Sequence, residues 1–421
     1  MRNFETANQT RSPRKISWDL LRVLAVYSVV VQHITHQSPI NHPELGPYPF
    51  VLPLQFGAST LMVLSAFFVC VTVRRGQPGR WLWNRLARLL PAYLLAVVVT
   101  YGISRAVTPL FGWYVPTPHD LLGNLLLIQA WSPEFHWIDA SYWTLPVQVM
   151  AFVMAALLWP RRWTHGRAVP VLLWTLVLAP LVIRFLWRGD DADQWVKSMF
   201  DGLALHRVAL FGVGVAIWLY TSKRLSSVHL GTYLVAALVA QDAHSYFVDT
   251  WSTLAFGAIL LGVVAAANGP DWTVFRLLSR PITWLGGITF GVYLVHQELG
   301  FVLARFLLDA GVGPLGRIVA CVSMAILLGW AMTRLVEQPA HRWLTATGPA
   351  AVGRARRGMT SVVAALRELP QVPQPHGPSF GGVPMRAEPS PRSVIHASTS
   401  AAEPCTSRDL AWVAMASSQV R

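Results

Sequence analysis

Apolar runs recur roughly every 25–35 residues along this chain, and many of them are long enough to cross a lipid bilayer. A membrane-spanning helix needs about 20 predominantly apolar residues, because the hydrocarbon core is about 30 Å thick. The chain of 421 residues is 53% hydrophobic and 13% charged, whereas soluble domains carry about 25% charged residues. This pattern predicts an all-α polytopic membrane protein.

We expect about ten transmembrane helices. The predicted spans are Ser17–His36, Phe50–Val73, Pro91–Val107, Tyr142–Trp159, Ala168–Trp187, Gly202–Tyr220, Val228–Asp242, Val248–Ala267, Thr283–Leu307 and Leu315–Val336. One further apolar stretch, Leu121–Trp131, is too short to span a bilayer. We therefore predict that it is a re-entrant or interfacial segment.

The distribution of basic residues predicts the orientation of the chain. With Leu121–Trp131 left out of the count, the inner loops before Thr283 hold 16 Lys and Arg, and the outer loops hold only Arg188 and Lys197. Cytoplasmic loops of membrane proteins carry such an excess, so both ends of the chain are expected in the cytoplasm. The formal charge of +14 is explained in this way, and we expect no nucleic-acid partner.

The chain divides into three parts by composition. Residues 1–15 form a polar, basic cytoplasmic tail without the cleavage site of a signal peptide. Residues 16–343 form the membrane domain, and residues 344–421 are rich in Pro, Ser and Arg and are expected to be a disordered cytoplasmic extension. The use of 31 Arg and three Lys is typical of a G+C-rich bacterial genome, so we expect a multi-pass protein of the bacterial cytoplasmic membrane. Three scattered Cys indicate neither a disulfide framework nor a metal site.

The first predicted span carries an unusual set of ionisable side chains. Asp19 and Arg22 are three residues apart, and His33 follows Arg22 by eleven positions. Eleven residues make three helical turns plus about 20°, so Arg22 and His33 share one face, about 16 Å apart along the axis. Ionisable residues inside a membrane are costly and therefore candidates for function. The alternative is structural, with Arg22 paired to Asp19 at the inner interface and His33 hydrogen-bonded at the outer one.

Five further stretches carry short motifs in a fixed order. They are GASTLMVLSAFFVC (57–70) with Ser65, RWLWNRLARLLPAYL (80–94) with Arg85 and Arg88, SYWTLPVQVMAFV (141–153) with Trp143 and Gln148, ITFGVYLVHQELG (288–300) with Tyr293 and His296, and VEQPAHRW (336–343) with Glu337. With the Asp19-Leu-Leu-Arg22 turn and His33, this ordered set resembles the acyltransferase family 3 membrane proteins. The resemblance covers nearly all of residues 16–343.

The resemblance implies an O-acyltransferase that moves an acyl group, commonly acetyl, from acyl-CoA to a hydroxyl of a sugar, cell-surface glycan or natural product. An alcohol that attacks a thioester needs a base near neutral pH, and histidine has a suitable ordinary pKa. We assign that role to His33. The oxyanion needs hydrogen-bond donors, for which Tyr293 and His296 are candidates. Hydrogen bonding between helices is the structural alternative for these two.

The donor is the expected partner on the inner side. Arg85 and Arg88 lie one helical turn apart, and their guanidinium groups suit the phosphates of CoA. An ordinary basic loop is the alternative. The distance from Arg22 to His33 suits a pantetheine arm that reaches from a bound nucleotide to a thioester beside the base. No metal is expected.

Several residues have weaker predictions. Trp143 suits sugar stacking, but we favour an interfacial anchor. Glu337 is expected to pair structurally with Arg334. Five arginines near outer helix ends would line an acceptor cavity or contact anionic lipid, namely Arg105, Arg184, Arg207, Arg305 and Arg317.

One departure from the family pattern matters for mechanism. Gln148 stands where the family has glutamate, so a mechanism that depends on that carboxylate is in doubt, whereas a base role for His33 is unaffected. Two alternatives therefore remain open, a transporter of a small polar solute and a catalytically degenerate member of the family. The ordered motifs and the lack of an internal repeat argue against the transporter.

Overall fold

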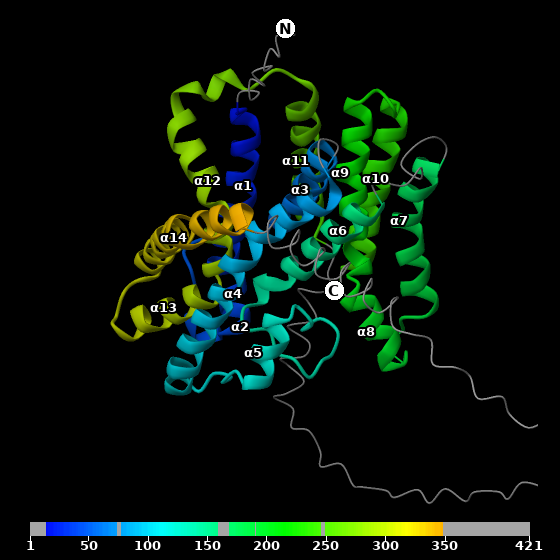
Figure 1. Ribbon diagram of the computed structural model, residues 1–421. Helices are drawn as coiled ribbons and strands as arrows, with labels where there is room; N and C mark the ends of the chain where they lie inside the picture. Colours follow the sequence, from blue (N-terminus) through cyan, green and yellow to red (C-terminus); the bar gives the residue numbers. More distant parts are fainter. Residues whose placement is uncertain (1–13, 74–76, 159–167, 190, 246–248, 348–421) are drawn as a thin grey trace, which may run out of the picture.

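The computed structural model describes residues 14–73, 77–158, 168–189, 191–245 and 249–347, and within these ranges it is helical without strands (Figure 1). The helices of the first half are α1 (Ile16–Gln32), η1 (His33–Gln37), α2 (Ser38–Asn41), η2 (Pro43–Leu45), α3 (Gly57–Val73), α4 (Pro78–Phe111), α5 (Pro118–Leu125), η3 (Ala140–Trp143) and α6 (Thr144–Leu158). Those of the second half are α7 (Ala168–Leu186), α8 (Gln194–Gly202), η5 (Leu205–Arg207), α9 (Val208–Thr221), α10 (Ser227–His244), α11 (Thr250–Asn268), η6 (Thr273–Leu278), α12 (Ser279–Val295), α13 (Glu298–Asp309), α14 (Pro314–Ala331) and η7 (Met332–Glu337). The predicted disordered extension lies outside the described residues from position 348 onward.

Six helical stretches of the described residues are long and apolar enough to cross a membrane. They are Pro78–Phe111, Ala140–Leu158, Ala168–Leu186, Gln194–Thr221, Thr250–Asn268 and Pro314–Thr347, and a bent pair makes seven if it counts as one span. The multi-pass character is thus supported, whereas the predicted total of ten spans and the cytoplasmic ends are not confirmed. α1 and α3 have 17 residues each, which is about 26 Å of helix and less than the hydrocarbon thickness.

The predicted span Thr283–Leu307 is not a continuous helix. The chain bends by 75° between α12 and α13, and the bend follows directly after His296. The Asp139 carboxylate accepts a hydrogen bond of 3.0 Å from the backbone N–H of Glu298, which satisfies one of the free donors at the start of α13. This break was not predictable from local sequence, because no proline or glycine stands at the bend.

Most of the core lies in two large apolar clusters that share the central helices, and a third, small cluster joins α3, α4 and α6. One lies among α3, α7, α9, α10 and α11, and the other among α1, α4, α12, α13 and α14. Figure 1 shows α7, α9 and α10 side by side, with α12, α13 and α14 on the opposite flank and α1 and α3 between them. Gly291 and Gly329 bring α12 and α14 into backbone contact, since a Cβ at Gly291 would lie 2.3 Å from the Gly329 carbonyl oxygen. α12, which carries the site residues below, is therefore held closely against α14.

α1 is fixed at its first turn by residues far along the chain. The Asp271 carboxylate accepts hydrogen bonds of 2.9 Å from the backbone N–H groups of Ile16 and Ser17. The Lys15 ammonium donates to the carbonyl oxygens of Ala266 and Gly269 at 3.3 and 3.1 Å. These contacts satisfy free N–H groups of the helix start and tie α1 to the end of α11.

Candidate functional site

Two histidines from opposite ends of the sequence meet in the interior. His33 begins the π-helical turn η1 after α1, and His296 stands at the end of α12. Their exposed fractions are 8% and 1%. His33 Nδ1 lies 2.9 Å from His296 Nε2, and the ring planes differ by 13°. The two motifs that the sequence placed 263 residues apart thus form one site.

The hydrogen bonds assign a tautomer to each ring. His296 Nδ1 lies 2.8 Å from the carbonyl oxygen of Tyr293, and a carbonyl only accepts, so this nitrogen carries the proton. In the neutral ring His296 Nε2 is then an acceptor, and His33 Nδ1 must donate to it. The remaining nitrogen of His33, Nε2, is left with its lone pair. Among the residues that the structure describes, none hydrogen-bonds to it.

A buried framework holds His296 in place. The Tyr293 hydroxyl donates to the Ser141 carbonyl at 3.0 Å, and the Tyr142 hydroxyl donates to the Leu294 carbonyl at 3.0 Å. Both bonds join η3 to the last turn of α12. The O–H of Tyr293 and the ring N–H of neutral His296 are both engaged in hydrogen bonds within the protein. The structural alternative of hydrogen bonding between elements is thus present, and the oxyanion role of the two residues stays a prediction.

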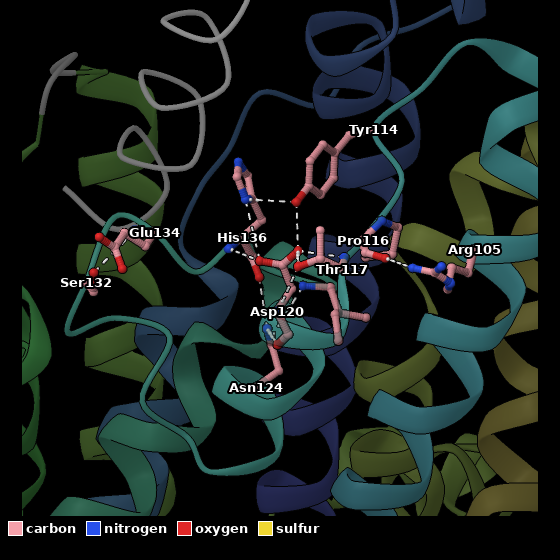
Figure 2. A network of polar contacts seen from close by, with 10 residues as sticks. Arg105, Tyr114, Pro116, Thr117, Asp120, Asn124, Ser132, Glu134 and His136 are labelled. Carbon is pink, nitrogen blue, oxygen red and sulfur yellow. Dashed lines mark hydrogen bonds and ion pairs between the residues drawn. The ribbon is translucent and has the colours of Figure 1, made fainter. Parts of the chain in front are cut away.

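A polar network covers this framework from the segment between α4 and α6, and sequence reasoning missed it (Figure 2). Asp120 stands at its centre, with 1% of the residue exposed. One carboxylate oxygen accepts from the Tyr114 hydroxyl at 2.7 Å and from Thr117, and the other accepts from the backbone N–H of His136 at 2.7 Å. Asn124 donates to the carbonyl oxygens of Asp120 and His136 at 2.8 and 2.9 Å. The network closes the segment that leads into Asp139 and η3.

The Asp120 network has an electrostatic signature. Burial opposes the charge of Asp120, but hydrogen bonds from Tyr114, Thr117 and His136 outweigh it and hold the pKa of this carboxyl below its usual value. Thr117 and Asp120 also form a capping box at the start of α5. The sequence Thr117-Pro-His-Asp120 carries that signature, so this part was detectable. The predicted re-entrant piece Leu121–Trp131 contains the rest of this short helix, followed by turns.

At the other end of α1 the predicted pair of Asp19 and Arg22 is present. An Arg22 amino group lies 3.2 Å from the fully buried Asp19 carboxylate. Arg14 adds a second, bidentate contact to the same carboxylate. The Arg22 guanidinium also lies 4.8 Å from the centroid of the Phe68 ring. Asp19 therefore organises two cations at the start of α1.

Arg85 and Arg88, the two arginines of α4 that are predicted to bind the phosphates of CoA, lie near Arg22. Arg22, Arg85 and Arg88 are close enough to repel one another electrostatically. Arg85 donates to the Thr72 hydroxyl at 2.7 Å. Arg88 forms an ion pair of 2.8 Å with Glu337, which corrects the predicted pairing of Glu337 with Arg334. Glu337 of the closing motif thus pairs with an arginine of α4 and not with one of its own helix.

The remaining candidates fall in different places. Trp143 is 8% exposed and stacks under the Arg207 guanidinium at 4.8 Å, so the predicted interfacial anchor is wrong, because the ring packs against protein. Ser65 on α3 and Gln148 on α6 are half-buried, and among the described residues neither side chain hydrogen-bonds to His33. Of the outer arginines, Arg317 is buried and donates to the Leu45 carbonyl at 2.8 Å.

A family model described as an acyltransferase domain matches residues 15–334, about three quarters of the chain. The chain belongs to acyltransferase family 3. No curated protein and no solved structure matches it significantly. The matched range of this family 3 acyltransferase contains the histidine pair, Asp19, Arg22, Arg85 and Arg88, whereas Glu337 lies just beyond its end.

The match decides the broad class of the protein. It is a multi-pass membrane acyltransferase, and the resemblance seen in the motifs is confirmed. For this acyltransferase the arrangement along α1 has a clear chemical meaning. A cluster of cations stands at the start of the helix, and an imidazole with a lone pair stands at its end.

Proposed function

We propose that this membrane acyltransferase moves an acyl group, acetyl in the simplest case, from acyl-CoA to a hydroxyl of a sugar, a cell-surface glycan or a natural product. The observation that carries the proposal is the His33–His296 pair. It leaves one imidazole nitrogen available as a base in a buried site. We place the protein in the bacterial cytoplasmic membrane with the basic end of α1 toward the cytoplasm, as the charge distribution favours.

In the proposed reaction His33 takes up one proton and later returns it. Nε2 of His33 takes the proton of the acceptor hydroxyl as its oxygen attacks the thioester carbonyl. When the carbon–sulfur bond breaks, the imidazolium returns this proton to the CoA thiolate. The products are the O-acyl ester and free CoA, and His33 is neutral again.

His296 is a positioning residue in this scheme. Its accepting Nε2 holds the proton of His33 on Nδ1, so that the reactive nitrogen is the one that faces away from the pair. The same hydrogen bond stabilises the imidazolium form of His33, because Nδ1–H of the charged ring then donates to His296 Nε2 in a charge-assisted bond. Tyr293 acts one step further, since its backbone carbonyl fixes the tautomer of His296.

Arg22, Arg85 and Arg88 are proposed to bind the phosphates of acyl-CoA. Together with Arg14 they set four guanidinium groups against the two carboxylates of Asp19 and Glu337. Like charges held this close to one another favour an anionic ligand. The spacing of about 16 Å along α1 suits an extended pantetheine arm between this cluster and His33.

The experiment is acyl transfer from radiolabelled acetyl-CoA by the purified full-length protein in detergent. We expect His33→Gln to reduce release of label from CoA by more than about 100-fold while CoA binding is retained. Arg22→Lys and Arg88→Gln should weaken CoA binding. Arg305→Gln is the matched control, since it removes an outer arginine that is paired with Asp309.

Two results would count against the proposal. Release of label that is equal in wild-type protein and His33→Gln would remove the base role. Equal CoA affinity in wild-type protein, Arg22→Lys and Arg88→Gln would remove the donor site. His296→Gln gives a finer test, because a positioning role predicts a shifted pH profile of kcat, whereas a purely structural role lowers the melting temperature without that shift.

A further inference from the structure

The hydroxyl of Thr72, one residue before the end of α3, joins α3 to α4. Its oxygen accepts hydrogen bonds from Nε1 of Trp81 at 3.0 Å and from an amino group of Arg85 at 2.7 Å. Its proton is donated to the carbonyl oxygen of Phe68 in the same helix. A hydroxyl has one proton to donate and two lone pairs to accept with. All three are in use, so this hydroxyl orients its neighbours and has no capacity left to bind a ligand itself.

Two arginines from different helices lie against one face of α3. Phe68 and Thr72 are four residues apart, so their side chains are neighbours on the same face of the helix. The Arg22 guanidinium of α1 lies 4.8 Å from the centroid of the Phe68 ring, and Arg85 of α4 donates to Thr72. The last turns of α3 therefore bring together two of the arginines that are proposed to bind the donor.

Aromatic rings restrict the Arg85 guanidinium further. It lies 5.6 Å from the centroid of the Trp81 ring and 5.8 Å from that of the Phe152 ring. The two aromatic residues are buried, and their rings contact each other edge to face. Both belong to the small apolar cluster that joins α3, α4 and α6. Fixed rings and the bond to Thr72 thus limit the directions in which the guanidinium can turn.

Arg85 and Arg88 are held in different ways, although they lie one helical turn apart. Arg88 forms its ion pair with Glu337 at 2.8 Å. Arg85 is half-buried, and among the described residues no carboxylate forms an ion pair with it. Thr72 accepts from one nitrogen of a guanidinium that has five N–H donors in all. A phosphate can therefore bind Arg85 without the loss of an ion pair, whereas at Arg88 it competes with Glu337.

We propose that Thr72 is a positioning residue of the donor site. Its hydroxyl fixes the guanidinium of Arg85, and Arg85 is the principal ligand of a CoA phosphate. The proposal rests on the proposed function, because it takes acyl-CoA as the ligand. A guanidinium that is already held in its bound orientation loses less side-chain freedom when the phosphate binds, and the affinity for the donor rises. The chemical step at His33, at the other end of α1, does not depend on this contact.

The experiment compares Thr72→Ser with Thr72→Cys in the purified full-length protein in detergent. Both variants lose the same methyl group, but serine keeps the accepting oxygen, whereas sulfur is a weak acceptor. CoA affinity is measured by titration calorimetry, and release of label from acetyl-CoA gives KM and kcat. We expect Thr72→Cys to weaken CoA binding about tenfold and Thr72→Ser to stay within about twofold of wild-type protein. KM should follow the affinity, and kcat should be retained.

A second substitution tests whether Thr72 acts through Arg85. Arg85→Gln alone should weaken CoA binding, and the addition of Thr72→Cys should then cause no further loss. Thr175→Val is the matched control, since this exposed threonine of α7 donates to the Val171 carbonyl of its own helix in the same way. Thr72→Val keeps the branched shape of threonine and replaces the cysteine variant if that protein fails to fold.

Three results would overturn the proposal and leave the donor site standing. The first is equal CoA affinity and KM in wild-type protein and Thr72→Cys, with a lower melting temperature of the variant, because Thr72 would then only join the two helices. The second is an equal loss of affinity in the serine and cysteine variants, which would assign the effect to the methyl group. The third is an additive loss in the double variant. Wild-type protein that binds no CoA would overturn the proposed function and this proposal together.

Discussion

The Asp120 network can be compared with a second polar group in the interior, around His206. We call this second group the His206 cluster, and it consists of Arg188, Asp201, His206 and His244. Both groups contain histidine, and they are satisfied to different degrees. Both carboxylate oxygens of Asp120 accept hydrogen bonds, and the side chain of Asn124 uses its donor and its acceptor. In the His206 cluster the ring nitrogens of His206 have no partner among the described residues. A satisfied network stabilises one structure, whereas buried polar atoms without partners cost free energy.

The difference predicts opposite responses to mutation. Removal of a member of the Asp120 network should strand its partners and destabilise the fold. Replacement of His206 by an apolar residue of suitable size should remove an unfavourable burial and spare the fold. The predictions below test this contrast from the largest expected effect to the smallest.

Asp120→Ala should have the largest effect. It removes the acceptor of Tyr114, Thr117 and His136 at once and leaves the backbone N–H groups of Thr117 and His136 without that acceptor. We expect the free energy of unfolding to fall by about 3 kcal/mol, measured by titration with SDS in mixed micelles. Asp193→Ala is a suitable control, since this residue lies on an exposed loop before α8. An unchanged free energy of unfolding would show that the network does not stabilise the fold.

His206→Phe should leave the fold intact or stabilise it by about 1 kcal/mol, because a buried group without partners is replaced by an apolar ring. Phe200 already packs beside His206, with ring centroids 5.9 Å apart. The same titration measures the change. A loss of 2 kcal/mol or more, of the order expected for a broken hydrogen bond, would place His206 in the same structural class as Asp120.

Tyr114→Phe should cost about 1 kcal/mol. It removes one hydrogen bond to Asp120 and leaves the bonds from Thr117 and His136 in place. The comparison with Asp120→Ala measures how the network divides its stability among its members. If the tyrosine variant loses as much as the alanine variant, the network acts as one unit and not as separate bonds.

The smallest effect is expected from pH. The pKa of Asp120 is lower in the folded protein than its ordinary value of 3.8, so the charged carboxylate stabilises the fold above that pH. This contribution is lost as the pH falls from about 4 through the folded pKa. The melting temperature between pH 5 and pH 3 should therefore fall more steeply in wild-type protein than in Asp120→Asn. Parallel curves would contradict the ionised, hydrogen-bonded state of Asp120.

Sequence reasoning succeeded where the signal was local or had a helical period. The pairing of Asp19 with Arg22 followed from their spacing and is present. The family followed from an ordered set of motifs and is confirmed. The expectation that Tyr293 and His296 share a site with His33 is met by a direct contact between the two imidazoles.

The parts that failed depend on contacts between distant segments. Glu337 pairs with Arg88 across 249 positions, and no periodicity relates the two. At the 75° bend after α12 the backbone N–H of Glu298 donates to Asp139, which lies 159 positions away in the sequence. The His206 cluster gathers side chains from four segments of the chain, and each of them alone resembles an ordinary residue at a helix end.

Arg22 and His33 lie on one continuous stretch of helix. The number of residues between them is therefore constrained, whichever side chains those residues carry. Loss of one residue between Arg22 and His33 would rotate the imidazole by about 100° around the helix axis and shift it by about 1.5 Å. Since α12 is pressed against α14 through Gly291 and Gly329, it has no freedom to follow. The ten residues of this interval therefore act as a register, in which substitutions are tolerated and insertions or deletions are not. Among homologous chains that keep both histidines, the interval should vary in composition and stay constant in length.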